Sequence, residues 1–336
     1  MRCALAVLLL TTLCAAATAA DRDLASGGTL QHIADVPLGG NTTRLDYESL
    51  DPRRHLLFIA HLGDSAVIVF DTQAQRVVRQ IPDISKVHGV LAIPELGRVY
   101  ASATGTNEVV AIDENTLQVI ARAPGGVYPD GMAYAPDVHK LYVSDEHGDT
   151  DTVIDVRTNT RTATISLKGD VGNTQYDSVT RHIFANVQTR AELVEIDPMT
   201  DRVITRTHLP GAEGNHGLLI EPSQHWAFIA CEDNHKLLVL DLGTRKVIRS
   251  FDVGADPDVL AYDRVLHYLY VATESGTVSL FKTGGGKVEK IADMRLGPNA
   301  HVVAVDAHTH KSYFPLKDVN GRPVLRIMSP GAVTGP

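Results

Sequence analysis

The chain has 336 residues, of which 44% are hydrophobic and 21% charged, and it contains 27 glycines and 16 prolines. This composition is typical of a globular protein rich in turns, and it excludes a disordered or collagen-like chain. Lysine and arginine number 31 against 40 acidic residues, a net charge of −9, and like charges form no long run. The sequence therefore predicts no nucleic-acid partner.

The first twenty residues have the pattern of a secretory signal peptide. A positive charge at Arg2 precedes an apolar run over residues 4–13 and a series of small residues up to residue 20. We therefore expect residues 21–336 to be exported, as a single domain, to the periplasm or the extracellular space. Lipidation at Cys14 is the alternative, which Leu13 disfavours because a lipoprotein signal has a small residue there. No apolar run is long enough to span a bilayer, so the mature chain is expected to have no membrane span.

Cleavage of the signal leaves Cys231 as the only cysteine of the mature chain. No intrachain disulfide can then form, and stability must come from the core. A free cysteine is most often an inert buried residue. The sequence also allows Cys231 to be a reactive or metal-binding thiol.

A repeat of about 42 residues covers nearly the whole mature chain. Its mark is an aromatic residue within a short apolar run, and successive anchors lie 42, 42, 42, 44, 42 and 43 residues apart. The anchors are Phe58, Tyr100, Tyr142, Phe184, Phe228, Tyr270 and Tyr313. Seven copies of one structural unit are expected.

Each unit is predicted to contain four short strands. About thirteen residues after each of the first five anchors, an apolar strand ends in an aspartate, which suits a tight turn because its carboxylate accepts hydrogen bonds from nearby backbone N–H groups. These aspartates are Asp71, Asp113, Asp155, Asp197 and Asp241. An outer strand such as residues 76–81 follows, and no ten-residue stretch has helical periodicity.

Seven units of four strands predict an all-β fold, a seven-bladed β-propeller, because a radial arrangement protects most sheet edges. The seventh unit supplies only three strands, ending near residues 326–328. Residues 29–38 lie just ahead of the first unit, where an outer strand belongs. The N-terminal strand is therefore expected to pair into the last blade and close the ring.

Two segments resemble the YVTN repeat of bacterial and archaeal seven-bladed propellers. They are residues 142–145 (YVSD) followed by 152–155 (TVID), and residues 270–273 (YVAT). The resemblance spans roughly residues 40–328 and implies an exported propeller of the periplasm or cell surface, with little implied chemistry. The tetrad departs from the pattern in other units, and Lys282 with a triple-glycine turn replaces the closing aspartate of the sixth.

Aspartate and histidine recur at one register, twelve residues before each anchor. Six of the seven positions carry them, namely Asp46, His88, Asp130, His216, Asp258 and His301, while the fourth is Gly172. Because the innermost strand of each blade begins at one face of a propeller, these side chains are expected to ring the channel mouth. Asn173 is expected to replace the side chain that Gly172 lacks.

A partial outer shell is predicted three residues after the anchors, where the second strand returns to the same face. Its polar members are His61, Asp145 and Cys231, and Glu146, Glu232 and Glu274 follow in nearby loops. Further histidines, at positions 55, 139, 182, 225, 267, 308 and 310, fall near the hairpins of the opposite face. They are expected to be exposed turn residues.

Imidazole and carboxylate groups are suited to Zn, Cu, Fe, Ni or Mn, with Cys231 favouring Cu or Zn. The sequence leaves open that the ring instead holds a small polar or anionic organic ligand. A third possibility is that the ring residues only cap turns such as Tyr128-Pro129-Asp130-Gly131 around a water-filled channel.

Three functions follow from these observations. The first is a binding module that holds a metal ion or small polar ligand at the mouth. The second is a metal-dependent enzyme, a hydrolase, lyase or oxidoreductase, that uses the same ring. The third is a platform for a periplasmic protein partner without a small ligand. No nucleophile elbow, P-loop, dinucleotide fingerprint, haem site or zinc-protease helix occurs.

Overall fold

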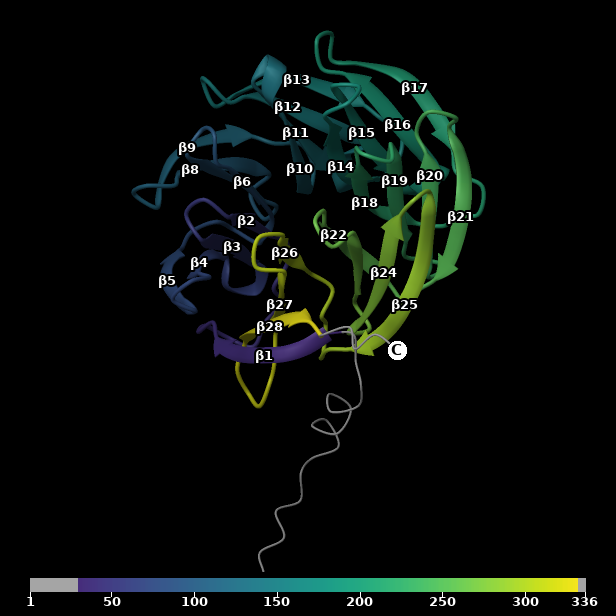
Figure 1. The fold of residues 1–336 in the computed structure, drawn as a ribbon. Coiled ribbons are helices and arrows are strands. Elements are labelled where there is room, and N and C mark those ends of the chain that lie inside the picture. The colour runs from purple at the N-terminus through teal and green to yellow at the C-terminus, as the bar shows by residue number, and fades with distance from the viewer. Residues whose placement is uncertain (1–29, 332–336) are drawn as a thin grey trace, which may run out of the picture.

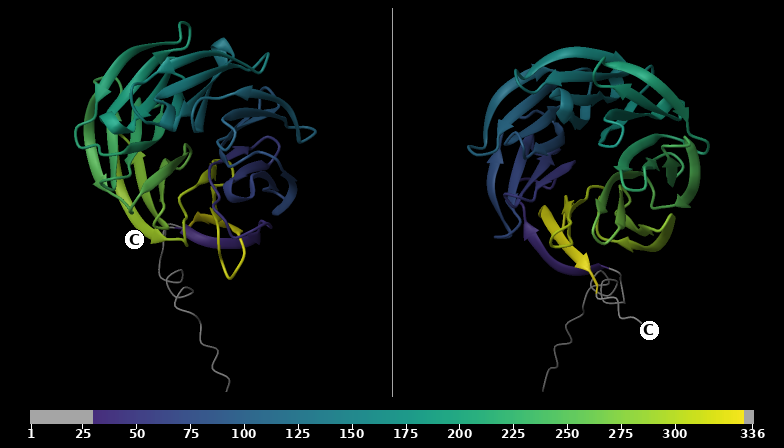
Figure 2. Two further views of the ribbon diagram at one scale, coloured as in Figure 1. Left: turned by 180° about the vertical axis from the view of Figure 1, so that it is seen from behind. Right: turned by 45° about the horizontal axis from the view of Figure 1, so that its top comes forward.

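The computed structural model describes residues 30–331, which form a closed ring of seven antiparallel sheets, each of four strands (Figure 1). The predicted seven-bladed propeller is confirmed. The signal peptide and Cys14 lie outside the described residues. In each blade the strands follow one another from the channel outward, so the seven innermost strands surround the centre and the outermost form the periphery (Figure 2).

The first four blades use consecutive strands. Blade 1 has β2 (Glu48–Asp51), β3 (Leu56–His61), β4 (Ala66–Asp71) and β5 (Arg76–Ile81); blade 2 has β6 (Val87–Ile93), β7 (Arg98–Ala103), β8 (Glu108–Asp113) and β9 (Gln118–Pro124); blade 3 has β10 (Pro129–Ala135), β11 (Lys140–Asp145), β12 (Thr150–Asp155) and β13 (Thr160–Ser166); blade 4 has β14 (Val171–Asp177), β15 (His182–Val187), β16 (Glu192–Asp197) and β17 (Arg202–His208).

Two more blades follow the same order, and the seventh is composite. Blade 5 has β18 (Asn215–Glu221), β19 (Trp226–Cys231), β20 (Lys236–Asp241) and β21 (Lys246–Asp252); blade 6 has β22 (Pro257–Asp263), β23 (Tyr268–Thr273), β24 (Thr277–Gly284) and β25 (Lys287–Arg295); blade 7 has β26 (Ala304–Asp306), β27 (Lys311–Leu316), β28 (Val324–Pro330) and β1 (Leu30–Pro37).

The ring closes through β1, as predicted. This strand pairs antiparallel with β28 from Leu30 opposite Pro330 to Pro37 opposite Val324, and in Figure 1 the purple N-terminal strand lies beside the yellow C-terminal one. The Arg326 guanidinium reinforces the pairing by donating to both carboxylate oxygens of Asp35, at 2.8 and 2.6 Å. The two ends of the described chain therefore stabilise each other.

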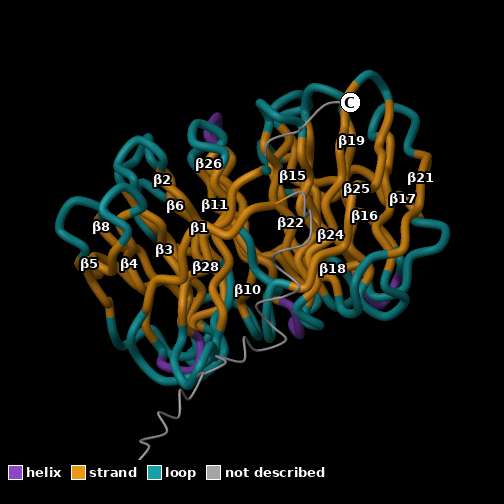
Figure 3. Tube along the Cα trace, turned by 60° about the horizontal axis from the view of Figure 1, so that its bottom comes forward, coloured by secondary structure: helices purple, strands orange, loops and turns teal. Residues whose placement is uncertain are grey.

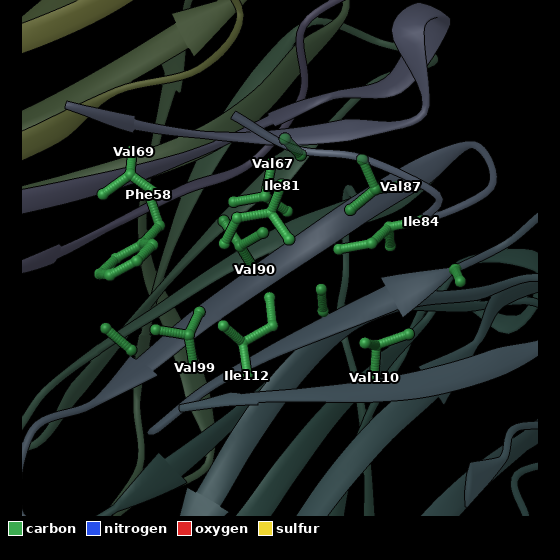
Figure 4. Close-up of a cluster of buried hydrophobic side chains, with 14 residues drawn as sticks. Phe58, Val67, Val69, Ile81, Ile84, Val87, Val90, Val99, Val110 and Ile112 are labelled. Atoms are coloured by element: carbon green, nitrogen blue, oxygen red, sulfur yellow. The ribbon is translucent and has the colours of Figure 1, made fainter. Parts of the chain in front are cut away.

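The core lies between blades, where the apolar faces of adjacent sheets pack. Figure 4 shows the cluster between the first two blades, where Phe58 and Val69 of one sheet face Val99 and Ile112 of the next. All seven aromatic anchors are at most 5% exposed. Burial of such side chains stabilises the fold by about 1.5–3 kcal/mol each, which explains why this position carries the repeat.

Loops gather on the two rims of the ring, above and below the strands (Figure 3). At the rim opposite the ring of aspartates and histidines, the closing aspartates accept bonds from backbone N–H groups as expected; Asp113 Oδ1, for example, bonds the N–H groups of Asn115 and Thr116 at 3.0 and 2.8 Å. The predicted outer strand at residues 76–81 is β5. The aspartates that the sequence places at the ends of these strands therefore cap the hairpin turns, as predicted.

Helical structure among residues 30–331 is confined to short 3-10 turns. They are η1 (Leu62–Asp64), η2 (Pro136–Val138), η3 (Glu146–Gly148) and η4 (Gln188–Arg190). Within the described residues, none of these is long or apolar enough to pass through a bilayer.

Candidate functional site

The local backbone explains how the ring residues reach the channel. In blade 2, Val87 pairs with Ala103 and Val90 with Ala101, so His88 and Gly89 together oppose one residue, Ser102. The same register shift occurs in blades 3 to 6. Such a bulge re-aims a side chain, and here the bulged residue is the one at the Asp/His register.

Glycine follows several ring residues because the next blade approaches too closely for a side chain. A Cβ on Gly89 would lie 2.2 Å from the carbonyl oxygen of Asp130, and one on Gly217 would lie 2.0 Å from that of Asp258. In blade 4 the ring position itself is under this restriction, because a Cβ on Gly172 would lie 2.7 Å from the His216 carbonyl oxygen. Close contact between blades therefore leaves no room for a seventh ring side chain.

The ring residues converge at the channel mouth on a pocket of about 380 Å³. Five of them line it, namely Asp46, His88, Asp130, His216 and Asp258. The sixth, His301, is 1% exposed and lies beside Asp46 and Asp258, just behind the pocket surface. The structure thus brings all six residues together, and ligand binding by them stays a prediction.

Imidazole nitrogens and carboxylate oxygens around the mouth face one another at distances longer than hydrogen bonds. Nε2 of His216 is 3.5 Å from Asp258 Oδ1, and Nε2 of His301 is 3.9 Å from Asp258 Oδ2. Two ligands of a tetrahedral metal with bonds of about 2.1 Å are roughly 3.4 Å apart. The spacing is therefore close to that required for donors that share an ion.

Two groups of residues have this geometry, and Asp258 belongs to both. In one, ligand atoms of Asp46, Asp258 and His301 all lie within 4.8 Å of one another; in the other, those of His216, Glu232 and Asp258 do. All but Glu232 are buried. The mouth thus has buried Asp and His groups that could bind a metal.

The expected outer shell is displaced by one residue along the chain. Glu146, Glu232 and Glu274, each immediately after a second strand, line the pocket. His61, Asp145 and Cys231, the last residues of β3, β11 and β19, do not appear in its lining. Side chains alternate along a strand, so when the last strand residue is buried in the blade, the next one points to the channel.

Each of the three displaced residues has a structural environment of its own. The His61 ring contacts Thr43 Oγ1 at 3.0 Å. Asp145 accepts hydrogen bonds from the Thr152 hydroxyl at 2.8 Å and from the backbone N–H of Gly126 at 2.9 Å. Cys231 is fully buried among apolar side chains, and burial raises the pKa of its thiol to about 12. The thiol therefore gives no reason to favour Cu or Zn.

Asn173 does not line the mouth pocket, whereas Tyr47 does. Asn173 lines a second cavity of about 150 Å³ deeper in the channel. Tyr47 lines both cavities, and its hydroxyl lies 3.1 Å from Nε2 of His216 on the far side of the ring. Tyr47 therefore forms the floor of the mouth pocket, a role that the Asp/His register does not reveal.

Second hydrogen bonds hold the imidazoles in position. Nδ1 of His301 lies 3.0 Å from the carbonyl oxygen of Asn299, and Nδ1 of His88 lies 3.1 Å from that of Lys86. Because a carbonyl only accepts, Nδ1 carries the proton in both rings. In the neutral state, Nε2 of His88 accepts a hydrogen bond from the Tyr128 hydroxyl at 3.1 Å, whereas the lone pair on Nε2 of His301 has no partner among the described residues. Lys86 and Asn299 both have positive φ, 46° and 61°, which folds each carbonyl back toward its histidine.

Crowding perturbs the carboxylates. Burial, reinforced by Asp258 and Glu146, raises the pKa of Glu232 to about 7 despite the opposing effect of His216. Burial also raises the pKa of Asp130 and of Asp258. These groups repel one another when ionised, and a cation among them would relieve the repulsion.

Protein cations partly compensate the acidic groups. Burial alone would lower the pKa of the His216 imidazole, but Glu232, Asp258 and Asp130 raise it to about 9. Arg44 donates from Nε to Asp46 Oδ2 at 2.8 Å and pairs with Glu274 Oε1 at 2.5 Å. The pocket has six lining carboxylates but only Arg44 and Lys86 as permanent cations, so it attracts positive charge.

Five of the seven opposite-face histidines occupy a second repeated position, three residues before the anchor. Five of the seven, namely His55, His139, His225, His267 and His310, have positive φ in the hairpin turn. His310 also contacts Asp263, with Nδ1 2.7 Å from Oδ2. No group of three or more potential metal ligands forms among these histidines within residues 30–331.

Comparisons with known proteins identify the fold. No family model matches the chain, and no curated protein matches it, so membership of the YVTN family stays a prediction. Among solved structures, 1718 chains match. One belongs to the Kuenenia stuttgartiensis hydrazine synthase, with a TM-score of 0.73 and 15% identity over 85% of this chain and 95% of the other. The chain is thus a seven-bladed β-propeller similar in fold to a propeller of that enzyme.

Proposed function

We propose that this protein is an exported β-propeller that binds a divalent transition-metal ion at its channel mouth. The observation that carries the proposal is that the His301 imidazole is buried, fixed in orientation and, within residues 30–331, unpaired at Nε2. This side chain is 1% exposed, its Nδ1 is held by a backbone carbonyl, and its Nε2 has no hydrogen-bond partner among the described residues. A buried, oriented and unpaired imidazole nitrogen is a costly feature unless a ligand uses it.

The donor set narrows the choice of ion. Asp46 and Asp258 stand beside His301, and His216 and Glu232 complete the second group, so oxygen ligands outnumber nitrogen ligands and sulfur is absent from both groups. Such a mixture suits Mn, Fe or Zn better than Cu, which prefers softer or more nitrogen-rich sites. Ni is not distinguished from these by the donor types alone.

Export of the mature chain is part of the proposal. The N-terminal charge, apolar run and small residues support it. A resemblance to YVTN propellers also supports a periplasmic or cell-surface location. Processing is tested by N-terminal sequencing of the protein recovered from a periplasmic fraction, where a mature chain that begins near residue 21 is expected.

A metal-dependent enzyme is the second candidate, because the pocket has room for more than an ion. Its volume is about 380 Å³, and exposed Lys86 lies at its edge beside the acidic groups. A small anionic substrate would contact Lys86 and the ion together. A hydrolase, lyase or oxidoreductase would each require an open coordination position.

Metal binding is tested on untagged protein stripped by chelator and dialysed against Mn²⁺, Fe²⁺ or Zn²⁺ under matched conditions, with metal content measured by mass spectrometry. The His301→Gln variant removes Nε2 while retaining side-chain polarity. We expect at least one ion per wild-type chain and a lower content in the variant. Equal content in the two proteins, or none in either, would refute the proposal.

A further inference from the structure

The two ligand groups at the mouth have one member in common. Asp258 is 5% exposed and stands between His216 and His301. Its two oxygens face different imidazoles: Oδ1 is 3.5 Å from Nε2 of His216, whereas Oδ2 is 3.9 Å from Nε2 of His301. A carboxylate placed in this way can bond one ion through each oxygen.

Two unpaired atoms provide evidence for ligands at the mouth beyond the acidic cluster itself. Asp258 Oδ1 and His301 Nε2 are both buried and have no hydrogen-bond partner among the described residues. Oδ1 faces the group with Glu232, and the imidazole nitrogen faces the group with Asp46. One unpaired atom therefore belongs to each side of Asp258.

From this geometry we propose that the mouth holds two divalent metal ions bridged by the Asp258 carboxylate, one bound with Asp46 and His301 and the other with His216 and Glu232. The inference rests on the proposed metal-binding function and extends it. Carboxylate-bridged ions in two-metal sites lie about 3.5–4 Å apart and act together on one substrate oxygen or phosphoryl group. The substrate class that such a centre would take is a small anion, which Lys86 at the pocket edge would also attract.

The two positions differ in their electrostatic surroundings. Arg44 contacts Asp46 and Glu274, so a permanent cation already stands beside the group with His301. The His216 group has no Arg or Lys in direct ion-pair contact among the described residues. We expect Arg44 to weaken binding of the ion beside His301.

Removal of Arg44 should therefore strengthen binding of the ion beside His301. A unit charge at about 4 Å contributes several kcal/mol at an effective dielectric constant of about 20, and tenfold in affinity corresponds to about 1.4 kcal/mol. The Arg44→Gln variant is expected to bind the ion beside His301 at least roughly tenfold more tightly, with little change in the ion beside His216. Equal tightening of both events would contradict the assignment of Arg44 to one position.

The test is a count of Mn²⁺ ions bound by untagged, metal-stripped protein, measured from the free Mn²⁺ signal in electron paramagnetic resonance. We expect two ions per wild-type chain, one in His301→Gln, one in Glu232→Gln, and loss of the bridged pair in Asp258→Asn. Glu114→Gln, which removes a buried carboxylate on the opposite rim, is the matched control and should retain two ions. Thermal unfolding checks that each variant is folded.

The outcomes separate this inference from the proposed function. One ion in the wild type would overturn the two-ion site and leave metal binding standing, whereas no ion would overturn both. The wild-type spectrum adds a readout that needs no variant, because two Mn²⁺ ions about 4 Å apart are magnetically coupled. Two bound ions without coupling would place the second ion elsewhere and also overturn the bridge.

Discussion

A buried pair of carboxyl groups at the rim opposite the mouth predicts a specific dependence of stability on pH. Asp51 at the end of β2 and Glu114 after β8 are each 1% exposed. Burial and then the neighbouring Asp51 raise the pKa of Glu114 to about 7, although Arg54 and Arg53 oppose the shift. Replacement of Glu114 by glutamine keeps the size of the side chain and removes its titration.

The sign follows from the two states of the chain. Below pH 4.5 Glu114 is protonated in both the folded and the unfolded protein, so it imposes no penalty. Between pH 4.5 and about 7 the folded state retains a proton that the unfolded chain has lost, so the wild-type free energy of unfolding falls as pH rises. Above pH 7 the full penalty is present, about 3 kcal/mol, because a tenfold change in proton affinity corresponds to about 1.4 kcal/mol.

We therefore expect Glu114→Gln to match the wild type at pH 4 and to exceed it at pH 8 by up to about 3 kcal/mol. With an unfolding entropy of about 2.1 cal/mol/K per residue over roughly 300 residues, this corresponds to a rise in Tm of about 5 °C. The assay is calorimetric unfolding of both proteins from pH 4 to 8.5 without added metal. The exposed Glu289→Gln change is the control and should shift neither curve by more than about 0.5 kcal/mol. Parallel curves, or a Glu114→Gln variant that is less stable at pH 8, would refute the reasoning.

Three further predictions concern ring closure, an interblade bond and the metal. Arg326→Met removes the bidentate pair with Asp35. We expect the free energy of unfolding to fall by about 2 kcal/mol in thermal unfolding, and limited proteolysis to release β1 earlier than in the wild type. Unchanged release of β1 would contradict this prediction. Tyr142→Phe deletes the 2.5 Å hydrogen bond to Asp201 Oδ1. The free energy of unfolding in urea should fall by about 1.5–3 kcal/mol; an unchanged free energy would show that the bond contributes nothing. Saturating metal at 100 times Kd should raise Tm by about 4 °C. This effect is expected to weaken as pH falls, because protons compete for His216, with a pKa of about 9, and for Glu232, with a pKa of about 7; a pH-independent rise would place the ion elsewhere.

The repeat made the fold predictable because the blades share one pattern of a buried anchor residue and capped hairpin turns. Aromatic anchors such as Tyr142 are buried, and turn aspartates such as Asp113 cap hairpins, so both marks recur at fixed spacing. The missing outer strand of blade 7 was predictable from counting strands. The ring of Asp and His was predictable for the same reason, since equivalent positions of equivalent strands meet at one rim.

The rest of the site depends on features that no repeat register specifies. Whether residue 231 or residue 232 faces the channel depends on where the strand ends, and a difference of one residue moves a side chain to the other face. Cys231 consequently lies in the core, while Glu232 lines the pocket. Tyr47 reaches the mouth from blade 1 alone, so no recurrence marks it. Arg44, Lys86 and Tyr128 share one position, two residues before a ring residue, but not a residue type. The crowding that excludes a side chain at Gly172 comes from the neighbouring blade.

Anomalous X-ray diffraction from crystals of untagged protein reconstituted with Mn²⁺ or Zn²⁺ tests the central claim most directly, because it locates the ion without reference to activity. The account predicts anomalous density at the channel mouth within bonding distance of Asp258, shared with His301 on one side and His216 on the other. Density only at the turn histidines of the opposite rim, or none at the mouth after reconstitution, would contradict it.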